Sequence, residues 1–236
     1  MADPFEAFIK AHATLGEAEL VPEISLHLAT DSHDIFQAAE NFNRPAEQRF
    51  PPYWAFAWPG GQAMARYILD NATDFAGARV VDIGSGSGIA AIAAALAGAS
   101  HVVAADIDPV SATVIGLNAA ANGCADRIEA TTSDLLGALP DADIILISDL
   151  VYEPELSTRV GAFLEMACLA GRPLLLGDRM SARQPANGME EIARYGARLV
   201  PPLSDQEVIG ARVWQFRRRA TTVAPVTPTP ASRQFR

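Results

Sequence analysis

A glycine-rich turn between a short apolar run and an alanine-rich segment constrains the fold of this chain more than any other feature. Residues 79–83 read Arg-Val-Val-Asp-Ile, which predicts a buried strand, and residues 89–96 have the composition of a helix. Between them, Gly84, Gly86 and Gly88 occupy alternate positions. Glycine allows a tight turn and lets a ligand approach the backbone, because no Cβ intervenes. The sequence therefore predicts a strand–turn–helix unit that binds a ligand at a strand's carboxyl end in an open α/β sheet.

The spacing of the glycines separates two classes of ligand. In the dinucleotide fingerprint G-x-G-x-x-G the third glycine would stand where this chain has Ile89. Asp82 precedes the turn, and its carboxylate would repel a pyrophosphate but attract a sulfonium or an α-ammonium. This pattern resembles motif I of the S-adenosylmethionine-dependent methyltransferases, which have a Rossmann-like, seven-stranded sheet. The resemblance implies S-adenosylmethionine as cofactor, bound by Asp82, Gly84, Ser85, Gly86 and Gly88.

A second apolar run, residues 101–105, ends at Asp106. Asp106 lies 22 residues after Gly84, close to the spacing of roughly 20 expected for an acid that binds ribose hydroxyls. We therefore predict that Asp106, with the adjacent Ile107, contacts the cofactor. Asp108 precedes Pro109 and is expected to cap the next helix. A ribose site alone does not separate S-adenosylmethionine from a nicotinamide cofactor, since both carry a ribose.

Two further strand ends carry polar residues. Ser133 and Asp134 follow a short strand predicted over residues 127–130. They either contact the adenine, as the resemblance implies, or form a turn capped by Asp134. Asp149 follows the strand predicted over residues 143–148, which should lie beside the first strand, and Tyr152 stands three positions later.

The pattern Asp149-x-x-Tyr152, together with Tyr-Trp-Ala-x-x-Trp-Pro-Gly-Gly at residues 53–61, resembles a subfamily of protein lysine methyltransferases called family 16. The resemblance covers roughly residues 50–218. Within the subfamily, the chain is most similar to bacterial and mitochondrial enzymes that methylate lysines of the electron transfer flavoprotein β-subunit. It implies a protein substrate that presents lysines.

In this interpretation Asp149 and Tyr152 are the catalytic pair. Asp149 would attract and orient the incoming ammonium, and Tyr152 would pack against the amine or form a hydrogen bond with it. A nearby anion raises the pKa of a lysine, so loss of the proton must come from desolvation, the sulfonium charge or water. The alternative for Asp149 is the cap of a helix that starts near Pro154.

Four aromatic residues lie within six positions just before the glycine turn. Trp54 and Trp58 either pack on the core or cover the cofactor, since aromatic faces attract cations. We assign Trp58 to the cofactor site. Tyr53 and Phe56 are expected to be core residues more than site residues.

Composition excludes several classes of protein. The net charge of −10 disfavours a nucleic acid substrate. The two cysteines are too few for a disulfide framework and lie in no metal-ligand pattern, so no metal is expected. Residues 88–105 are almost uncharged but rich in alanine, and they predict a helix followed by a strand, not a membrane span. With no signal peptide visible, a cytoplasmic protein with no membrane partner is expected, and a monomer is favoured.

The expected fold class is α/β: a Rossmann-like, seven-stranded, mostly parallel sheet with helices on both faces. Residues 1–50 form an N-terminal α/β extension, with a helix over 3–15, a strand over 24–28 and a helix to Asn41 capped by Asp31 or Ser32. Residues 51–219 form the methyltransferase domain, and residues 220–236 a disordered tail. Near the end we predict a helix over 187–197, and the resemblance implies an antiparallel edge pair over 198–201 and 211–217. Asp178 and Arg179 stand at a strand's carboxyl end, where they either face the substrate or form a surface turn, and the surface turn is favoured.

Several other functions stay open. The acceptor could be a ribosomal protein or a small-molecule amine, which purified candidate acceptors would separate. A binding module that has lost catalysis is a non-enzyme alternative, disfavoured by the intact Gly84, Asp106 and Asp149. A nicotinamide-dependent oxidoreductase is disfavoured by Gly88 and Asp82, and titration with S-adenosylhomocysteine and with the dinucleotide would test it.

Overall fold

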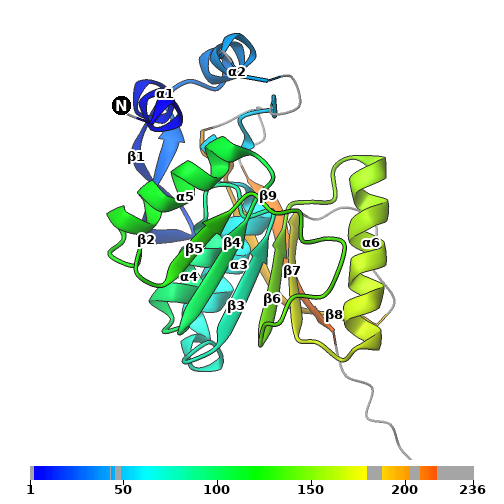
Figure 1. Cartoon of the computed structure of the whole chain (residues 1–236). Helices are drawn as coiled ribbons and strands as arrows, with labels where there is room; N and C mark the ends of the chain where they lie inside the picture. The colour runs from blue at the N-terminus through cyan, green and yellow to red at the C-terminus, as the bar shows by residue number, and fades with distance from the viewer. Residues whose placement is uncertain (1–2, 43, 46–48, 180–187, 202–207, 217–236) are drawn as a thin grey trace, which may run out of the picture.

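The computed structural model of the protein describes residues 3–42, 44–45, 49–179, 188–201 and 208–216. Its centre is a seven-stranded sheet in the order β5-β4-β3-β6-β7-β9-β8 (Figure 1). The neighbouring strands from β5 to β7 are parallel, and β9 pairs antiparallel with both β7 and β8. The strands are β3 (Arg79–Ile83), β4 (His101–Ala105), β5 (Ile128–Thr131), β6 (Ile144–Ser148), β7 (Leu174–Arg179), β8 (Met189–Ala197) and β9 (Ile209–Phe216). The predicted fold class is confirmed.

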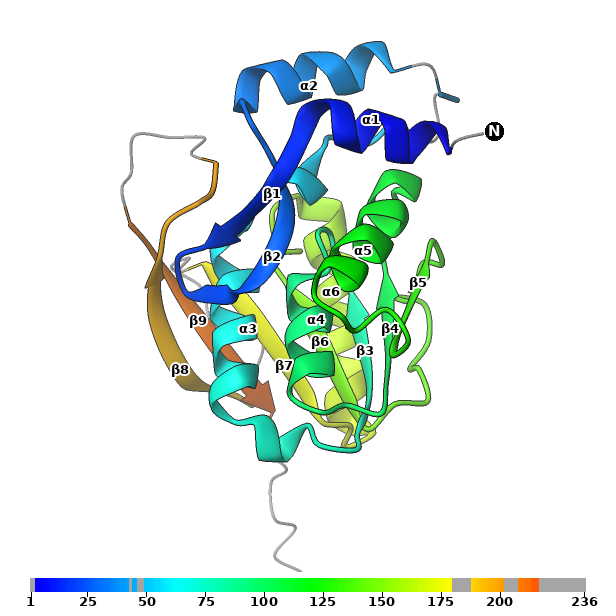
Figure 2. The ribbon, with the colours of Figure 1, turned by 90° about the vertical axis from the view of Figure 1, so that its left-hand side faces the viewer.

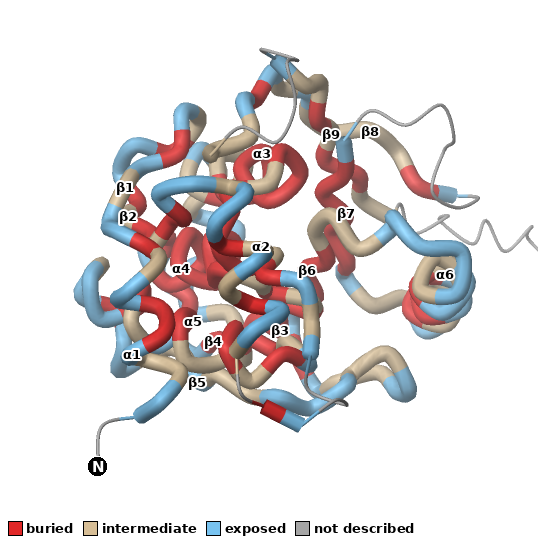
Figure 3. Tube along the Cα trace, turned by 90° about the horizontal axis from the view of Figure 1, so that it is seen from above, coloured by how far each residue is buried: buried red, intermediate tan, exposed pale blue. Residues whose placement is uncertain are grey.

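Helices cover both faces of this sheet, because successive side chains of a strand point to opposite faces. Val80 packs in one core cluster with residues of α3 and α4, whereas Val81 packs in another with residues of α6. Figure 3 shows α6 set apart from α3 and α4, on the far side of the sheet. The helices are α3 (Pro59–Asp70), α4 (Ile89–Leu96), α5 (Pro109–Ala121) and α6 (Pro154–Leu169), with short 3-10 turns at Tyr53–Ala55 and Ala72–Asp74.

The N-terminal extension contains α1 (Pro4–His12), a two-stranded antiparallel sheet of β1 (Ala13–Ala18) and β2 (Val21–Ala29), and α2 (Ser32–Asn41). The helix predicted over residues 3–15 is too long, because Ala13, Thr14 and Leu15 pair with β2. A helical pattern in the sequence cannot show that a partner strand will take up these backbone groups. The cap at Asp31 is confirmed, since its carboxylate accepts hydrogen bonds from the amides of His33 and Asp34.

Two asparagines of α5 attach the extension to the sheet domain. The Asn118 side-chain oxygen accepts a 2.8 Å hydrogen bond from the His27 amide, and that of Asn122 accepts one of 3.0 Å from the Ser25 amide. The side-chain nitrogen of Asn118 donates to the carbonyl of Ser87 at 2.8 Å. Figure 2 shows β2 running beside α5. The fully buried Asn118 thus joins β2 to the glycine turn.

The structure corrects the sequence prediction near the end of the chain. Residues 188–197 of the predicted helix do not form one: Met189–Ala197 is the edge strand β8. A bulge between Glu191 and Ala193 leaves Ile192 as an extra residue, which breaks the alternation of a strand and mimics a helical period. Of the strand predicted over 198–201, Val200 makes one isolated bridge to Ala57. Residue 187, residue 217 and the predicted tail over 220–236 lie outside the described residues.

The long uncharged stretch over residues 88–105 divides into α4 and β4, as predicted. Among the described helices, none combines the length and the apolar character that crossing a bilayer requires.

Candidate active site

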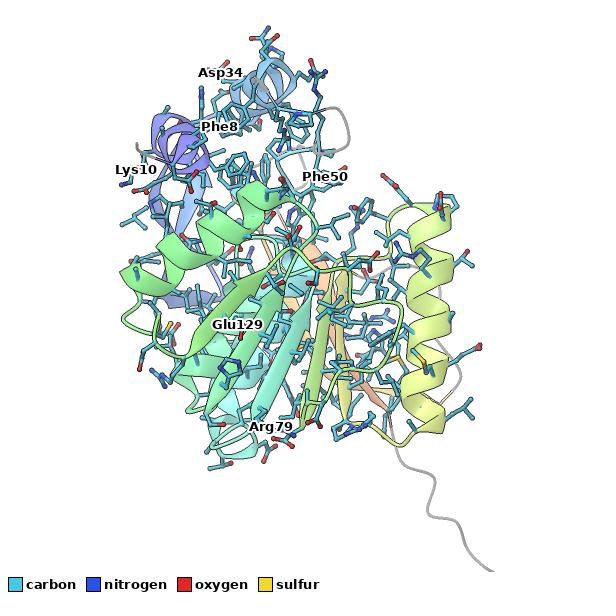
Figure 4. The ribbon with its side chains drawn as sticks, viewed as in Figure 1. Phe8, Lys10, Asp34, Phe50, Arg79 and Glu129 are labelled. Carbon is cyan, nitrogen blue, oxygen red and sulfur yellow. The ribbon has the colours of Figure 1, made fainter. Side chains whose placement is uncertain are left out.

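A cavity of about 440 Å³ opens at the carboxyl ends of the parallel strands. It lies where β3 has β4 on one side and β6 on the other, so chain order reverses there, which is the usual ligand position in open α/β sheets. Figure 4 shows Phe50, which lines the cavity, above this end of the sheet, and Arg79 at the opposite end.

The glycine turn forms part of the cavity wall. Gly84 and Gly86 both line it and both have positive φ, at 71° and 55°. The amides of Gly84 and Ser85 donate to the carbonyl of Ala105 at 2.8 and 3.0 Å, which fixes the turn against β4. Apart from its chain neighbours, no atom of the described residues lies within 4 Å of the position that a Cβ on Gly86 would take. The turn therefore leaves open the space that a bound ligand would need.

The structure does not bring every residue of the turn to the cavity. Asp82, Ser85 and Gly88 are outside its lining. The Asp82 carboxylate is 1% exposed and accepts a 2.6 Å hydrogen bond from the Ser85 hydroxyl. Burial raises the pKa of Asp82 to about 6. In the described geometry Asp82 holds the turn through Ser85 and lies outside the cavity lining, and its attraction for a cofactor cation stays a prediction.

Asp106 does line the cavity, with both carboxylate oxygens held by backbone amides. They accept hydrogen bonds from Gly86 at 2.8 Å and from Asp108 at 3.0 Å. Burial raises the pKa of Asp106 above its ordinary value. Asp108 caps α5 through the Val110 amide, as predicted, and Ile107 is half exposed on the cavity wall.

Asp108 also anchors the segment that leads into the cavity. Its carboxylate forms a buried ion pair with Arg44 at 3.1 Å. The same guanidinium donates to the carbonyl of Phe50 at 2.7 Å. The contact holds Phe50 beside the cavity and was not visible in the sequence, since the two charges are 64 residues apart.

Ser133 and Asp134 line the cavity on its β5 side. The Asp134 carboxylate accepts a 3.1 Å hydrogen bond from the Leu136 amide, which is the turn expected from the sequence. It also pairs with Arg159 of α6, and this contact lowers the pKa of Asp134. The position of both residues leaves them available to a ligand.

Asp149 is held by the N-terminus of a helix distant in sequence. Its Oδ2 accepts a 2.8 Å hydrogen bond from the Gly61 amide, in the first turn of α3. Its own amide donates to the Gly177 carbonyl at 2.9 Å, and its φ of 53° is positive. A Cβ on Gly60 would lie 2.6 Å from the other carboxylate oxygen, so the glycines of α3 make this approach possible.

This contact revises one of the two interpretations of Asp149. The residue does cap a helix, but the helix is α3, whereas α6 begins at Pro154 with no side-chain cap. Asp149 lines the cavity as well. Burial raises the pKa of Asp149 to about 7, against the opposing effect of the Gly61 amide.

Three aromatic rings form one wall of the cavity. Tyr53 meets Trp58 and Tyr152 edge-on, with ring centroids 5.6 and 5.4 Å apart. Trp58 donates its indole N–H to the Tyr53 carbonyl at 2.8 Å. Tyr152 is 42% exposed. Its partial burial raises the pKa of its hydroxyl group to about 12. Tyr53 thus belongs to the site, although the sequence favoured the core for it.

Trp54 does not reach the cavity. It is 1% exposed and lies 6.4 Å from Phe8 of the extension in an edge-on arrangement. The possible cofactor role of Trp54 is therefore wrong, whereas Phe56 is a core residue as expected.

Asp178 belongs to the site as well. The sequence favoured a surface turn for it over a position facing the substrate, but Asp178 lines the cavity and is only 8% exposed. The strand β7 continues through Arg179 because Asp178 and Arg179 pair with Arg212 and Ala211 of β9. Strand length here depends on a partner that the local sequence does not reveal.

The charge of the lining restricts the ligand. Seven carboxylates line the cavity, compared with two guanidinium groups, Arg159 and Arg179. Such a site attracts cations and opposes a pyrophosphate. The carboxylates belong to Asp106, Asp108, Asp134, Asp149, Glu153, Glu155 and Asp178.

Comparison with known proteins finds methyltransferases, both among similar sequences and among family models. The chain is 42% identical to the electron transfer flavoprotein β-subunit lysine methyltransferase of Danio rerio, over 84% of this chain and 77% of that protein. It is 32% identical to the Xenopus laevis enzyme of the same description, over 89% of this chain and 86% of that protein. The sequence model of the ribosomal protein L11 methyltransferase family matches residues 63–151.

Among solved structures, the fold is similar to that of magnesium protoporphyrin IX methyltransferase from Synechocystis with bound S-adenosylmethionine. The TM-score is 0.51 at 18% identity, covering 80% of this chain and 92% of that one. At this identity the likeness shows a shared fold.

Proposed function

Because the chain belongs to the family of electron transfer flavoprotein β-subunit lysine methyltransferases, we propose that it methylates lysine ε-amino groups of that β-subunit, with S-adenosylmethionine as methyl donor. The observation that carries the proposal is one cavity holding both a glycine turn with Asp106 and the pair Asp149 and Tyr152. The first set suits a nucleoside with a cationic sulfur, and the second suits a cationic side chain.

The residues present fit S-adenosylmethionine. The space above Gly86 is open, Asp106 stands at the turn to accept hydrogen bonds from ribose hydroxyls, and the lining is acidic. Ser133 and Asp134 are proposed to meet the adenine, with Ile107 and Trp58 packing against the cofactor. When bound, S-adenosylmethionine supplies an electrophilic methyl group on a sulfonium.

Asp149 is proposed to orient the acceptor lysine. A free lysine has a pKa of about 10.4, so it enters as an ammonium and is attracted by the carboxylate. The nitrogen must then be neutral to use its lone pair, and Asp149 alone opposes loss of the proton. Exclusion of water by Tyr53, Trp58 and Tyr152 favours the neutral amine, because burial disfavours the charged form. Alignment of the nitrogen is therefore the main contribution of these residues.

The extent of the two sequence matches favours the flavoprotein subunit over a ribosomal protein. The ribosomal protein L11 methyltransferase family matches only residues 63–151, which include the glycine turn and Asp106 but neither Tyr53 nor Tyr152. The flavoprotein enzymes match along most of the chain. Tyr53, Trp58 and Tyr152, which form the aromatic wall, therefore lie outside the match to the ribosomal protein L11 methyltransferase family but inside the match to the flavoprotein enzymes.

A labelling experiment tests this proposal. The purified protein is incubated with methyl-labelled S-adenosylmethionine and either purified electron transfer flavoprotein β-subunit or purified ribosomal protein L11. Label in the β-subunit, lost on protease treatment and assigned to lysine by mass spectrometry, is expected. Label only in L11, or only in protease-resistant material, would contradict the proposed substrate.

A further inference from the structure

Asp178 is a buried carboxylate that the proposed mechanism does not yet use. It stands near the end of β7, is 8% exposed and lines the same cavity as Asp149. Its register partner on β9 is Arg212, which fixes its position in the sheet. A carboxylate this deeply buried normally has a charged partner, so the environment of Asp178 requires an explanation.

Other acidic side chains of the cavity are already engaged. Asp106 accepts from two backbone amides, Asp134 pairs with Arg159, and Asp149 accepts from the Gly61 amide. Within the described part of the chain, the Asp178 carboxylate has no ion pair and no side-chain hydrogen bond, and the Arg179 amide is its hydrogen-bonding neighbour.

Arg212, the cationic residue paired with Asp178 across the sheet, makes its own contacts with other side chains. The Arg212 guanidinium lies 3.5 Å from Glu191 and over the Trp214 ring, 5.5 Å from its centroid. Burial raises the pKa of Asp178 to about 6, with Arg179 and Arg212 opposing the shift only in part. Among the described residues, no cation therefore pairs directly with the carboxylate that Asp178 presents to the cavity.

The backbone brings Asp178 close to Asp149. The Asp149 amide donates to the carbonyl of Gly177, the residue before Asp178. A Cβ on Gly177 would lie 2.5 Å from the Gly60 carbonyl, so β7 and the start of α3 are in direct contact. The negative charge of Asp178 repels that of Asp149 and so raises the pKa of Asp149. An arriving cation would relieve this repulsion.

We propose that Asp178 is a second acceptor-binding residue, whose carboxylate binds the lysine nitrogen together with Asp149 and makes the site specific for a cationic side chain. The inference rests on the proposed function. A neutral amine has two N–H donors and one lone pair. One donor to each carboxylate would leave the lone pair free to face the methyl group.

The experiment compares three variants with the wild-type enzyme. Asp178→Asn keeps the shape and removes the charge, Asp178→Glu keeps the charge, and Asp143→Asn is a matched control. Asp143 pairs with Arg79 at the opposite end of the sheet (Figure 4). Methylation of purified electron transfer flavoprotein β-subunit gives kcat and KM, and calorimetry gives the Kd for S-adenosylhomocysteine.

The expected result is a KM for the acceptor that rises about tenfold or more in Asp178→Asn, the order of a lost charge-assisted hydrogen bond. The kcat should stay within about threefold and the Kd should not change, because the contact is made in both ground and transition states. Asp178→Glu should recover part of the affinity, and Asp143→Asn should behave as wild type.

Three outcomes would overturn the inference. If wild type is active and Asp178→Asn has the same KM, Asp178 does not bind the acceptor, while the proposed function stands. If KM, kcat, Kd and Tm all worsen together and Asp178→Glu recovers nothing, Asp178 is structural. If wild type methylates no lysine of the β-subunit, the proposed function fails and the role of Asp178 with it.

Discussion

The Oδ2 of Asp149 accepts a 2.8 Å hydrogen bond from the backbone amide of Gly61, 88 residues earlier in the chain. Amides in the first turn of a helix have no partner within the helix, and a carboxylate there is further stabilised by the helix dipole. The contact joins the Trp-Pro-Gly-Gly segment to the Asp-x-x-Tyr segment. Two motifs that the sequence presents separately thus form one structural unit.

Asp149→Ala is expected to lower kcat/KM for the acceptor by roughly 100-fold or more, because misalignment of the reacting nitrogen has effects of this size. The Kd for S-adenosylhomocysteine should change little. Loss of the α3 cap should lower stability by about 1 kcal/mol, which a thermal melt can measure. Asp126→Ala, on an exposed surface, is the control. Normal turnover in Asp149→Ala would remove this residue from the mechanism.

Gly60→Ala tests whether the close approach of α3 positions Asp149. The new Cβ would lie 2.6–2.8 Å from three atoms of the carboxyl group, so the carboxylate must move. We expect methyl transfer to fall about tenfold or more, with a stability loss of roughly 1–3 kcal/mol from overpacking.

The same substitution at Gly116 is a matched control. Gly116 lies within α5, and outside the helix backbone a Cβ there would meet no atom of the described part of the chain within 4 Å. Alanine should raise stability by roughly 0.5–1 kcal/mol and leave activity unchanged. Equal activity in the Gly60 and Gly116 variants would argue against positioning by α3.

Asp106→Ala is expected to weaken cofactor binding first. Its carboxylate is placed to accept hydrogen bonds from ribose hydroxyls, and bonds to a charged group are worth roughly 1.5–3 kcal/mol. Titration calorimetry with S-adenosylhomocysteine should therefore show a Kd increase of roughly ten- to a hundredfold. Measuring the acceptor KM at saturating cofactor provides the comparison, since it should change less. An unaltered Kd would count against the ribose assignment.

The raised pKa of Asp149 predicts a pH dependence of stability. Burial and the charge of Asp178 raise this pKa to about 7, whereas the Gly61 amide and Arg179 oppose the shift. The native carboxyl group thus keeps a proton between about pH 4 and 7, where the unfolded chain has lost it. Its contribution to stability is present at low pH and is lost as the pH rises through 7.

Thermal melts of the ligand-free protein at pH 5 and pH 8 measure this effect. Asp149→Asn cannot ionise, so its Tm should improve relative to wild type as the pH rises. If instead the Tm of the wild type rose relative to that of Asp149→Asn between pH 5 and pH 8, stabilisation of the carboxylate by the α3 N-terminus would be larger than the cost of burying its charge.

The sequence alone determined the elements that position the cofactor. Apolar runs, an alanine-rich helix and alternate glycines are local patterns with local causes, and β3, α4 and the cap at Asp108 follow them. The spacing from Gly84 to Asp106 placed two strand ends together because parallel strands share an edge. For the same reason Asp134 and Asp149 were expected at this edge.

Tertiary structure decided the remaining features, because each depends on a partner distant in sequence. Asp149 is held by Gly61, and β7 extends to Asp178 because β9 pairs with it. Residues 189–197 became a strand because β9 offered an edge and a bulge absorbed the irregular pattern. A local sequence carries its own propensities, whereas the hydrogen-bond partners and burial that override them exist only in the folded chain.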